Sequence, residues 1–277
     1  MLRKVAIVFL ALLCVFTVAF VVSIAFKSPS HQRNWKKEYA VLPAVDFNGS
    51  LVKIRNIRNF SYGSDGAILK ARYYDKQFEI NELEGLWYGI SHFYDYGLAH
   101  TFLSFGFANG TFLTVSVEAR QEIGESYHPV TGLLRNYELI FVLGDERDIV
   151  GLRTHIRKER LYLYEINVPL PAIERLFRIM LRRVNEIRER PEFYNTLTDN
   201  CTTSLLRYAK RLSFWDLYFD YRVVLPGYSD ELAYELRVIP TDAPLHEIRE
   251  RYRLDPSRTS LDDPAFSRKL RGLSPEA

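Results

Sequence analysis

The sequence contains little cysteine and almost no net charge. Cys14 and Cys201 are the only cysteines among its 277 residues, so neither a disulfide framework nor a multi-cysteine zinc site is available. The spacing of the six histidines predicts no metal site either. The formal net charge of +3 argues against a protein that holds nucleic acid through bulk charge.

Several catalytic signatures are also missing. The chain has no G-x-S-x-G nucleophile elbow, no H-E-x-x-H zinc motif and no glycine-rich phosphate loop. We therefore expect no cofactor and no metal. The sequence does contain 47% hydrophobic and 14% aromatic residues, which indicates a folded domain with a sizeable core rather than a disordered chain.

The longest apolar stretch is Val5–Phe26, which carries no charged residue. As a helix it is about 30 Å long, which matches the hydrocarbon thickness of a bilayer. We expect residues 1–26 to be an uncleaved, single-pass membrane anchor; a cleaved signal peptide ending at Ser23-Ile24-Ala25 is the alternative. The short basic start favours a body outside the cytoplasm, although basic residues flank the run on both sides.

Composition divides the remainder of the chain into three parts. Residues 27–45 are polar and contain prolines, and we expect them to form a tether. Residues 46–240 carry the strand and helix patterns and are expected to form one domain. Residues 241–277 are rich in charge, proline and serine, and are expected to be a peripheral tail.

Two periodicities alternate within the domain. Asn81 followed by Glu84 resembles a capping box, and apolar residues then recur at helical spacing, so we predict a helix over 82–95. From His100 onward the period changes to two on both sides of Asn109-Gly110, which predicts a β-hairpin. Further strands are predicted at 137–143, 148–155 and 161–168.

Two helices follow the strands. The first starts at Pro169-Leu170-Pro171 and has one apolar stripe; its arginines are expected to form a solvated face, with contact to phospholipid headgroups as the alternative. The second is predicted over Cys201–Leu212. Antiparallel strands between helices indicate an α+β fold, in which an antiparallel sheet with packed helices is preceded by one transmembrane helix.

Cys201 is the candidate nucleophile. The loop before it delivers the thiol to the first turn of a helix, where free N–H groups and the helix dipole stabilise a thiolate. Its neighbours Asp199, Asn200, Thr202 and Thr203 are all polar, which is unusual around a cysteine that only fills a core. A buried and inert thiol is the alternative.

A thiol nucleophile needs a base, usually a histidine that a third group holds in place. His100 opens the first strand of the hairpin, where a rigid scaffold keeps an imidazole still, and His128 in a loop is the second choice. The other histidines are less well placed: His31 lies in the expected tether, His246 in the tail, and His92 and His155 at expected surface positions.

The identity of the third group depends on the hairpin register. With a two-residue turn, His100 faces Ala119. With a three-residue loop that is bulged at Gly110, His100 faces Glu118 at a Cβ distance of about 5 Å. Glu118 is therefore the candidate orienting carboxylate, and an exposed carboxylate paired with Arg120 is the alternative.

An ordered series of motifs runs through the domain. It consists of Ala99–Phe107 (AHTFLSFGF), Ser116–Arg120 (SVEAR), Gly124–Tyr127 (GESY), Asp145–Asp148 (DERD), Phe193–Asn195 (FYN) and Asn200–Thr203 (NCTT). Over about residues 45–235 the chain thereby resembles the bacterial domains named after the N-terminal periplasmic part of Lnb, a lipoprotein N-acyltransferase. The order of histidine strand and cysteine helix also resembles the permuted papain-like arrangement of NlpC-type and lecithin:retinol acyltransferase-type enzymes.

The resemblance implies a thiol mechanism at Cys201 and His100, in a bacterial inner-membrane protein whose body faces the periplasm. The implied reaction moves an acyl group from a phospholipid, through a cysteine thioester, to an amine such as a lipoprotein N-terminus. A thiol amidase or peptidase of the cell envelope and a non-catalytic lipid- or protein-binding module are the alternatives. The expected partners are thus phospholipid, lipoprotein or peptide, and the membrane, without nucleic acid. The expected substrate-binding or oxyanion residues are Thr202, Asn200, Arg120 and Tyr127.

Overall fold

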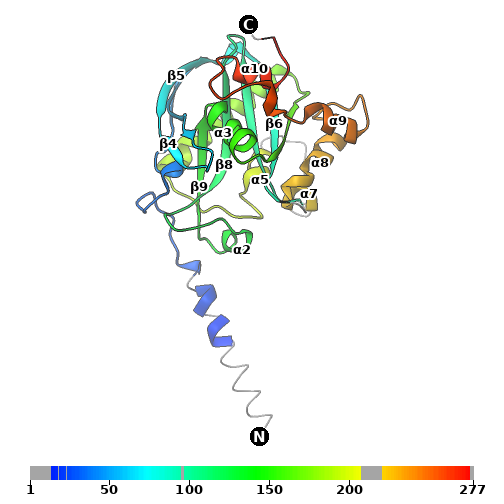
Figure 1. The fold of residues 1–277 in the computed structure, drawn as a ribbon. Helices are drawn as coiled ribbons and strands as arrows, with labels where there is room; N and C mark the ends of the chain where they lie inside the picture. Colours follow the sequence, from blue (N-terminus) through cyan, green and yellow to red (C-terminus); the bar gives the residue numbers. More distant parts are fainter. Residues whose placement is uncertain (1–13, 18, 23, 95–96, 207–219, 275–277) are drawn as a thin grey trace.

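The protein is described here by a computed structural model, which covers residues 14–17, 19–22, 24–94, 97–206 and 220–274 (Figure 1). Its centre is an eight-stranded sheet, in which all but one of the strand pairs are antiparallel. The strands follow the order β1 (Ala44–Asn48), β2 (Leu51–Arg58), β9 (Glu138–Gly144), β8 (Phe112–Arg120), β7 (Ala99–Phe107), β6 (Leu83–His92) and β10 (Arg160–Glu165), with β5 (Tyr73–Glu79) paired to β2. A separate two-stranded sheet contains β3 (Ser61–Tyr62) and β4 (Ile68–Lys70).

Helix α4 (Leu170–Glu189) packs on one face of the sheet. Its apolar residues recur at helical spacing and are buried, as the sequence predicts. Phe177 lies with its ring centre 4.8 Å from that of Phe105 in β7, so the helix and the sheet share one core. The mostly antiparallel sheet with packed helices confirms the predicted α+β class.

The opposite face carries the shorter helices. Helix α3 (Glu146–Gly151) continues into the π-helical turn η3 (Leu152–Ile156), and α10 (Phe266–Leu270) packs beside them. Phe102 of β7, Val150 of α3 and Phe266 of α10 belong to one buried cluster. The sheet is therefore covered on both faces, and its central strands are largely buried on both sides.

The remaining helices lie around the sheet. They are α2 (Pro129–Gly132), α5 (Cys201–Leu206), α7 (Tyr221–Val224), α8 (Ser229–Glu235), α9 (Leu245–Tyr252) and the short turns η1 (Lys37–Tyr39), η2 (Ile80–Glu82), η4 (Pro226–Tyr228) and η5 (Pro256–Arg258). Helix α5 begins at Cys201, as predicted, and packs against β7 and β8. The rest of the predicted helix, residues 207–212, lies outside the described residues.

The helix predicted over 82–95 is wrong, because this segment forms strand β6. Both faces of β6 are buried, so its apolar residues do not alternate and their spacing imitates a helix. The packing of the strand also explains the glycine at position 89. A Cβ on Gly89 would lie 2.2 Å from the Phe102 ring, so the close approach of that ring requires glycine.

The strand predicted over 148–155 is also wrong, because these residues form α3 and η3. Asp145 is the N-cap of α3, and its side chain accepts a hydrogen bond from the backbone N–H of Arg147 at 2.9 Å. Asp148 accepts hydrogen bonds from the side chains of Arg58 and Tyr62 and from the backbone N–H of Phe60. This buried carboxylate fixes α3 to the sheet.

The hairpin of β7 and β8 is confirmed and has the three-residue loop. Phe102 pairs with Ser116 and Gly106 with Phe112, which is the register that brings His100 to Glu118. Gly110 has φ of +75°, as the bulge position of such a loop requires.

Residues 27–45 differ from the expected tether, because they pack along the domain. Trp35 is buried beneath the guanidinium of Arg120, whose central carbon lies 4.1 Å from the indole ring centre. His31 Nε2 donates to the backbone oxygen of Ile187 at 2.9 Å. The segment ends in β1, so it forms part of the folded unit.

The charged tail is likewise part of the fold. Phe266 and Leu270 of α10 are almost completely buried. Arg271 forms a bidentate ion pair with the buried Glu146 and stacks on Trp87 and Phe112. At least one charged side chain of residues 241–277, that of Arg271, therefore pairs with a buried carboxylate of the domain.

The expected membrane anchor falls largely outside what the structure describes, because residues 1–13, 18 and 23 are not covered. Within the part of the chain that is covered, no helix has both the length and the apolar character needed to cross a bilayer.

Candidate active site

A cavity of about 860 Å³ opens at the edge where β7 begins and β8 ends. Cys201, His100 and Glu118 all line it, although they come from α5, β7 and β8. The loop that contains Tyr127 forms another part of its wall. The structure thus brings together three side chains that are far apart in the sequence.

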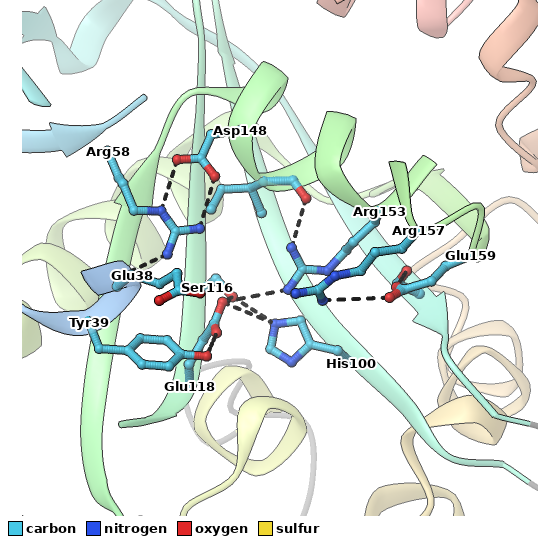
Figure 2. Close-up of polar contacts among 12 residues, drawn as sticks. Glu38, Tyr39, Arg58, His100, Ser116, Glu118, Asp148, Arg153, Arg157 and Glu159 are labelled. Carbon is cyan, nitrogen blue, oxygen red and sulfur yellow. Dashed lines mark hydrogen bonds and ion pairs between the residues drawn. The ribbon is translucent and has the colours of Figure 1, made fainter. Parts of the chain in front are cut away.

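The imidazole of His100 is held through its Nε2 atom. Nε2 lies 2.7 Å from the hydroxyl of Ser116 and 3.8 Å from Oε1 of Glu118 (Figure 2). The same hydroxyl lies 2.8 Å from Glu118 Oε1. His100, Ser116 and Glu118 therefore form a chain of hydrogen bonds along one face of the hairpin.

The direction of these hydrogen bonds fixes the tautomer of His100. An ionised Glu118 only accepts, so the single proton of Ser116 is donated to it. Ser116 must then accept from His100 Nε2–H. This leaves the lone pair on Nδ1, which has no hydrogen-bond partner among the residues that the structure covers. Nδ1 is therefore the ring atom that can accept a proton.

Glu118 has two further partners. The hydroxyl of Tyr39 donates to its Oε2 at 3.1 Å, and Arg153 Nη2 lies 3.6 Å from its Oε1. Arg153 is itself held by a 2.7 Å hydrogen bond from Nη1 to the backbone oxygen of Ile149. The carboxylate is thus enclosed by donors and does not pair with Arg120, which contradicts the alternative weighed from the sequence.

These surroundings keep Glu118 ionised. Burial alone raises the pKa of a carboxyl group. Here the charge that His100 carries once it is protonated at low pH, the charges of Arg153 and Arg58 and the hydrogen bond from Ser116 outweigh burial and lower the pKa of Glu118 to about 2. The ionised acceptor that the hydrogen-bond chain requires is therefore present at neutral pH.

The same surroundings keep His100 neutral. Burial, followed by the positive charge of Arg153, lowers the pKa of His100 to about 3, even though Glu118 opposes the change. Arg157 acts in the same direction. At rest, then, Cys201 faces a cavity whose imidazole is uncharged, and no thiolate–imidazolium pair is favoured.

Asn200 holds the start of α5. Its side-chain oxygen accepts from the backbone N–H groups of Thr202 at 2.8 Å and Thr203 at 2.7 Å, and its amide nitrogen donates to the backbone oxygen of Thr196. Asn200 is thus the N-cap of α5, and it occupies two of the N–H groups expected to hold an oxyanion. The cap sets the position of Cys201, which is only 5% exposed.

Two tyrosines lie close to the thiol. Burial raises the pKa of both Tyr127 and Tyr194, and the charge that a Cys201 thiolate would carry acts in the same direction on both. For Tyr127, hydrogen bonds with Tyr194 and Thr196 oppose this rise in part. The hydroxyl oxygens of the two tyrosines are 3.5 Å apart and both residues line the cavity. Both phenols remain protonated, and a protonated phenol is a hydrogen-bond donor.

Two of the predicted binding residues do not face the cavity. Arg120 is 2% exposed, and its side chain donates to the backbone oxygens of Tyr39 and Ala40. This packing contradicts a substrate-binding role for Arg120. Thr202 is completely buried, with its hydroxyl 3.2 Å from that of Thr101, so it fastens α5 to β7.

Four residues of the site were not anticipated: Tyr39, Ser116, Arg153 and Tyr194. Ser116 and Tyr194 belong to the motif series, where Ser116 precedes Glu118 by the two positions that keep both on one strand face. Tyr39 and Arg153 gave no signal, because they reach Glu118 from the expected tether and from a segment expected to be a strand.

The described residues contain no group of three or more His, Cys, Asp and Glu side chains able to hold a metal ion. What the fold presents is an α+β domain in which a buried cysteine at a helix start and a carboxylate-supported histidine on a strand share one cavity.

The chain belongs to the family described as the Lnb N-terminal periplasmic domain, whose model matches residues 70–227. The match includes His100, Glu118 and Cys201. It confirms the resemblance, although the matched residues span a shorter range than the expected 45–235. A domain of this family faces the periplasm. Neither a curated protein nor a solved structure matches the chain.

Proposed function

We propose that the protein is a thiol acyltransferase that moves an acyl group from a phospholipid to an amine such as the N-terminus of a lipoprotein. The observation that carries the proposal is that Cys201 and His100 line the same cavity, with Glu118 and Ser116 holding the ring of His100 at Nε2. The same arrangement supports a permuted papain-like relationship between the cysteine helix and the histidine strand.

The first half of the reaction forms a thioester. The thiol proton of Cys201 passes to His100 Nδ1 while the sulfur attacks the carbonyl carbon of the acyl ester. The tetrahedral intermediate then breaks its ester C–O bond, and the departing alcohol takes the proton back from Nδ1. The positive charge on the transient imidazolium is stabilised by Glu118 through Ser116.

The second half transfers the acyl group. The amine attacks the thioester carbon and gives a proton to His100 Nδ1, and Cys201 leaves as a thiol by taking that proton. The amide forms as the C–S bond breaks, so the enzyme returns to its starting state. A water molecule in place of the amine would make the protein a hydrolase.

The oxyanion needs donors other than the capped N–H groups. The backbone N–H of Cys201 and the hydroxyls of Tyr127 and Tyr194 are the groups that we assign to it, because the three residues line the same cavity and the phenols remain protonated. Asn200 serves indirectly, by holding the helix start.

The lining of the cavity suits an acyl chain. Apart from the polar groups named above, its wall contains mainly apolar and aromatic side chains. These include Phe93, Leu98, Val117, Val130, Val224 and Leu225. An apolar N-terminal segment that anchors the protein in the inner membrane would raise the effective concentration of a lipid donor.

The test compares the wild type with Cys201→Ala in the native membrane. We expect wild type to give lipoproteins whose mass includes the additional N-acyl group and to give lysophospholipid, and the variant to give neither. Envelope peptides that accumulate in the variant, with no change in lipoprotein mass, would instead identify a thiol amidase or peptidase.

A second measurement distinguishes an enzyme from a non-catalytic binding module. The rate of Cys201 alkylation by iodoacetamide is followed against pH in wild type and in His100→Ala. We expect the histidine to accelerate alkylation near neutral pH, so the variant reacts more slowly. Equal rates in the two proteins would mean that the thiol and the imidazole do not act together.

A further inference from the structure

Three large apolar side chains are exposed around α2. Val130 is 56% exposed, Leu133 is 38% exposed, and Leu197 from the neighbouring loop is 42% exposed. We call these three residues the apolar rim. Val130 also lines the cavity, so the rim adjoins the cavity mouth. Apolar side chains that gather at the mouth of a site indicate contact with a partner.

The backbone beneath the rim is held in place. His128 caps α2, with its Nδ1 accepting from the Val130 N–H at 3.2 Å. The hydroxyl of Thr196 donates to the backbone oxygen of Pro129 at 2.7 Å, which joins the loop of Leu197 to α2. A Cβ on Gly132 would lie 2.3 Å from that hydroxyl oxygen, so the two segments are in close contact. Hydrogen bonds and close packing therefore hold the backbone of the apolar rim in one position.

The N-terminal segment leaves the domain beside this surface. Lys27 Nζ donates to the backbone oxygen of Leu134 at 3.1 Å and to the side chain of Asn136 at 2.6 Å. Arg135 Nη1 donates to the backbone oxygen of Ala25 at 3.2 Å. These contacts fix the start of the domain against the chain that follows α2, and Figure 1 shows the segment pointing away from the domain on the α2 side.

The segment itself is apolar and uncovered. Phe26 is 82% exposed, and the large apolar side chains before it that the structure describes are also exposed: Val15, Phe16, Phe20, Val21 and Val22. The hydrocarbon core of a bilayer removes such apolar side chains from water on all sides of the helix. Lys27 follows Phe26 directly and Arg135 contacts the backbone at Ala25, so two long basic side chains lie at the end of the apolar segment, where such side chains reach lipid headgroups.

We propose that the apolar rim docks on the lipid bilayer that holds the N-terminal segment, so that the mouth of the cavity lies at the membrane surface. Docking would let an acyl chain enter the cavity without crossing water, and only this purpose rests on the proposed function. The contact itself follows from the side on which the apolar segment leaves the domain and from the exposure of Val130, Leu133 and Leu197.

The experiment measures the depth of spin labels in the full chain. Cys14→Ser and Cys201→Ser remove the native thiols, and single labels are placed through Val130→Cys, Leu133→Cys or, as the matched control, Leu273→Cys. Leu273 is 42% exposed and follows closely after α10, which Figure 1 shows on the side of the domain away from α2. The chain is reconstituted in vesicles of phosphatidylethanolamine and phosphatidylglycerol, and label collisions with oxygen and with a water-soluble nickel chelate are compared.

We expect the ratio of oxygen to nickel collisions to be several-fold higher at positions 130 and 133 than at position 273. Because the chain used lacks the thiol, this result supports docking even where wild type shows no acyl transfer. Equal ratios at all three positions would overturn docking even where transfer is intact. Dipolar broadening between labels at 130 or 133 would overturn it too, because it would identify a second copy of the chain as the occupant.

Discussion

Glu118 Oε1 lies 3.8 Å from His100 Nε2, with the hydroxyl of Ser116 placed between them. Ser116 is on the same strand as Glu118, and the hairpin register brings both beside the start of β7. The carboxylate thus acts on the imidazole mainly through a hydroxyl. This arrangement orients the ring and selects its tautomer while leaving Nδ1 for chemistry.

Ser116→Ala removes the group that joins the histidine to the carboxylate. We expect the rate of acyl transfer to fall by roughly 10- to 100-fold, as when an orienting partner of a functional histidine is lost. Thr114→Val is the matched control, since Thr114 lies two residues earlier on β8 and its buried hydroxyl has no partner among the described residues. The comparison is made by steady-state kinetics with both variants folded. A similar loss in the control would attribute the effect to packing of the strand.

The pH dependence of stability follows from the lowered pKa of His100. In the unfolded chain this imidazole takes up a proton near pH 6.5, whereas in the folded protein it does so only near pH 3. Stability is therefore lost as the pH falls below 6.5, by about 1.4 kcal/mol at pH 5.5. The half-buried His31, whose pKa is also lowered, adds to this loss, and Glu118 adds a further loss between pH 4.5 and about 2.

Urea unfolding of wild type and His100→Gln at pH 7.0 and 5.5 measures this effect. The glutamine variant should lose less stability between the two pH values than wild type does. His246→Gln replaces a histidine whose side chain is 79% exposed and should retain the whole loss. An unchanged difference in His100→Gln would show that the imidazole already carries a proton in the folded protein.

Asn200→Ala removes the cap of α5. The N–H groups of Thr202 and Thr203, both on buried residues, then lack an acceptor. We expect the free energy of unfolding to fall by about 1–2 kcal/mol and alkylation of Cys201 to become faster, because the thiol is no longer held in its buried position. Asn200→Ser keeps a capping oxygen and should recover most of the stability. Equal stability of the alanine and serine variants would argue against the cap.

Local patterns in the sequence predicted the parts of the site that lie within one hairpin. The alternation around Asn109-Gly110 gave two registers, and one of them placed Glu118 beside His100. The side chains that complete the site were missed because they arrive by tertiary packing. Tyr39 comes from a segment whose polarity suggested a tether, and Arg153 from a helix hidden by β-like composition.

The helix wrongly predicted over 82–95 has a physical cause in the packing of the sheet. In a sheet covered on both faces the period-two signal disappears, so β6 resembled a helix. The structural role of Arg120 was hidden for a related reason. Nothing in its neighbourhood in the sequence indicates that Trp35 and the backbone of residues 39–40 lie against it.

Arg271 tests whether the charged tail is structural. Its guanidinium forms two hydrogen bonds with the carboxylate of Glu146, which is 1% exposed, and it stacks 4.0 Å from the ring centre of Phe112. Arg271→Met leaves that carboxylate buried without its partner, so we expect the free energy of unfolding to fall by about 3–5 kcal/mol. Glu146→Leu combined with Arg271→Met removes both charges, and should restore much of the loss because apolar side chains then fill the site. Urea unfolding of the single and double variants gives the coupling between the two residues.

The exposed pair of Arg251 and Asp242 is the control, for which Arg251→Met should change stability by less than about 1 kcal/mol. If Arg271→Met and Arg251→Met were equally stable, the buried ion pair would contribute no more to stability than the exposed one.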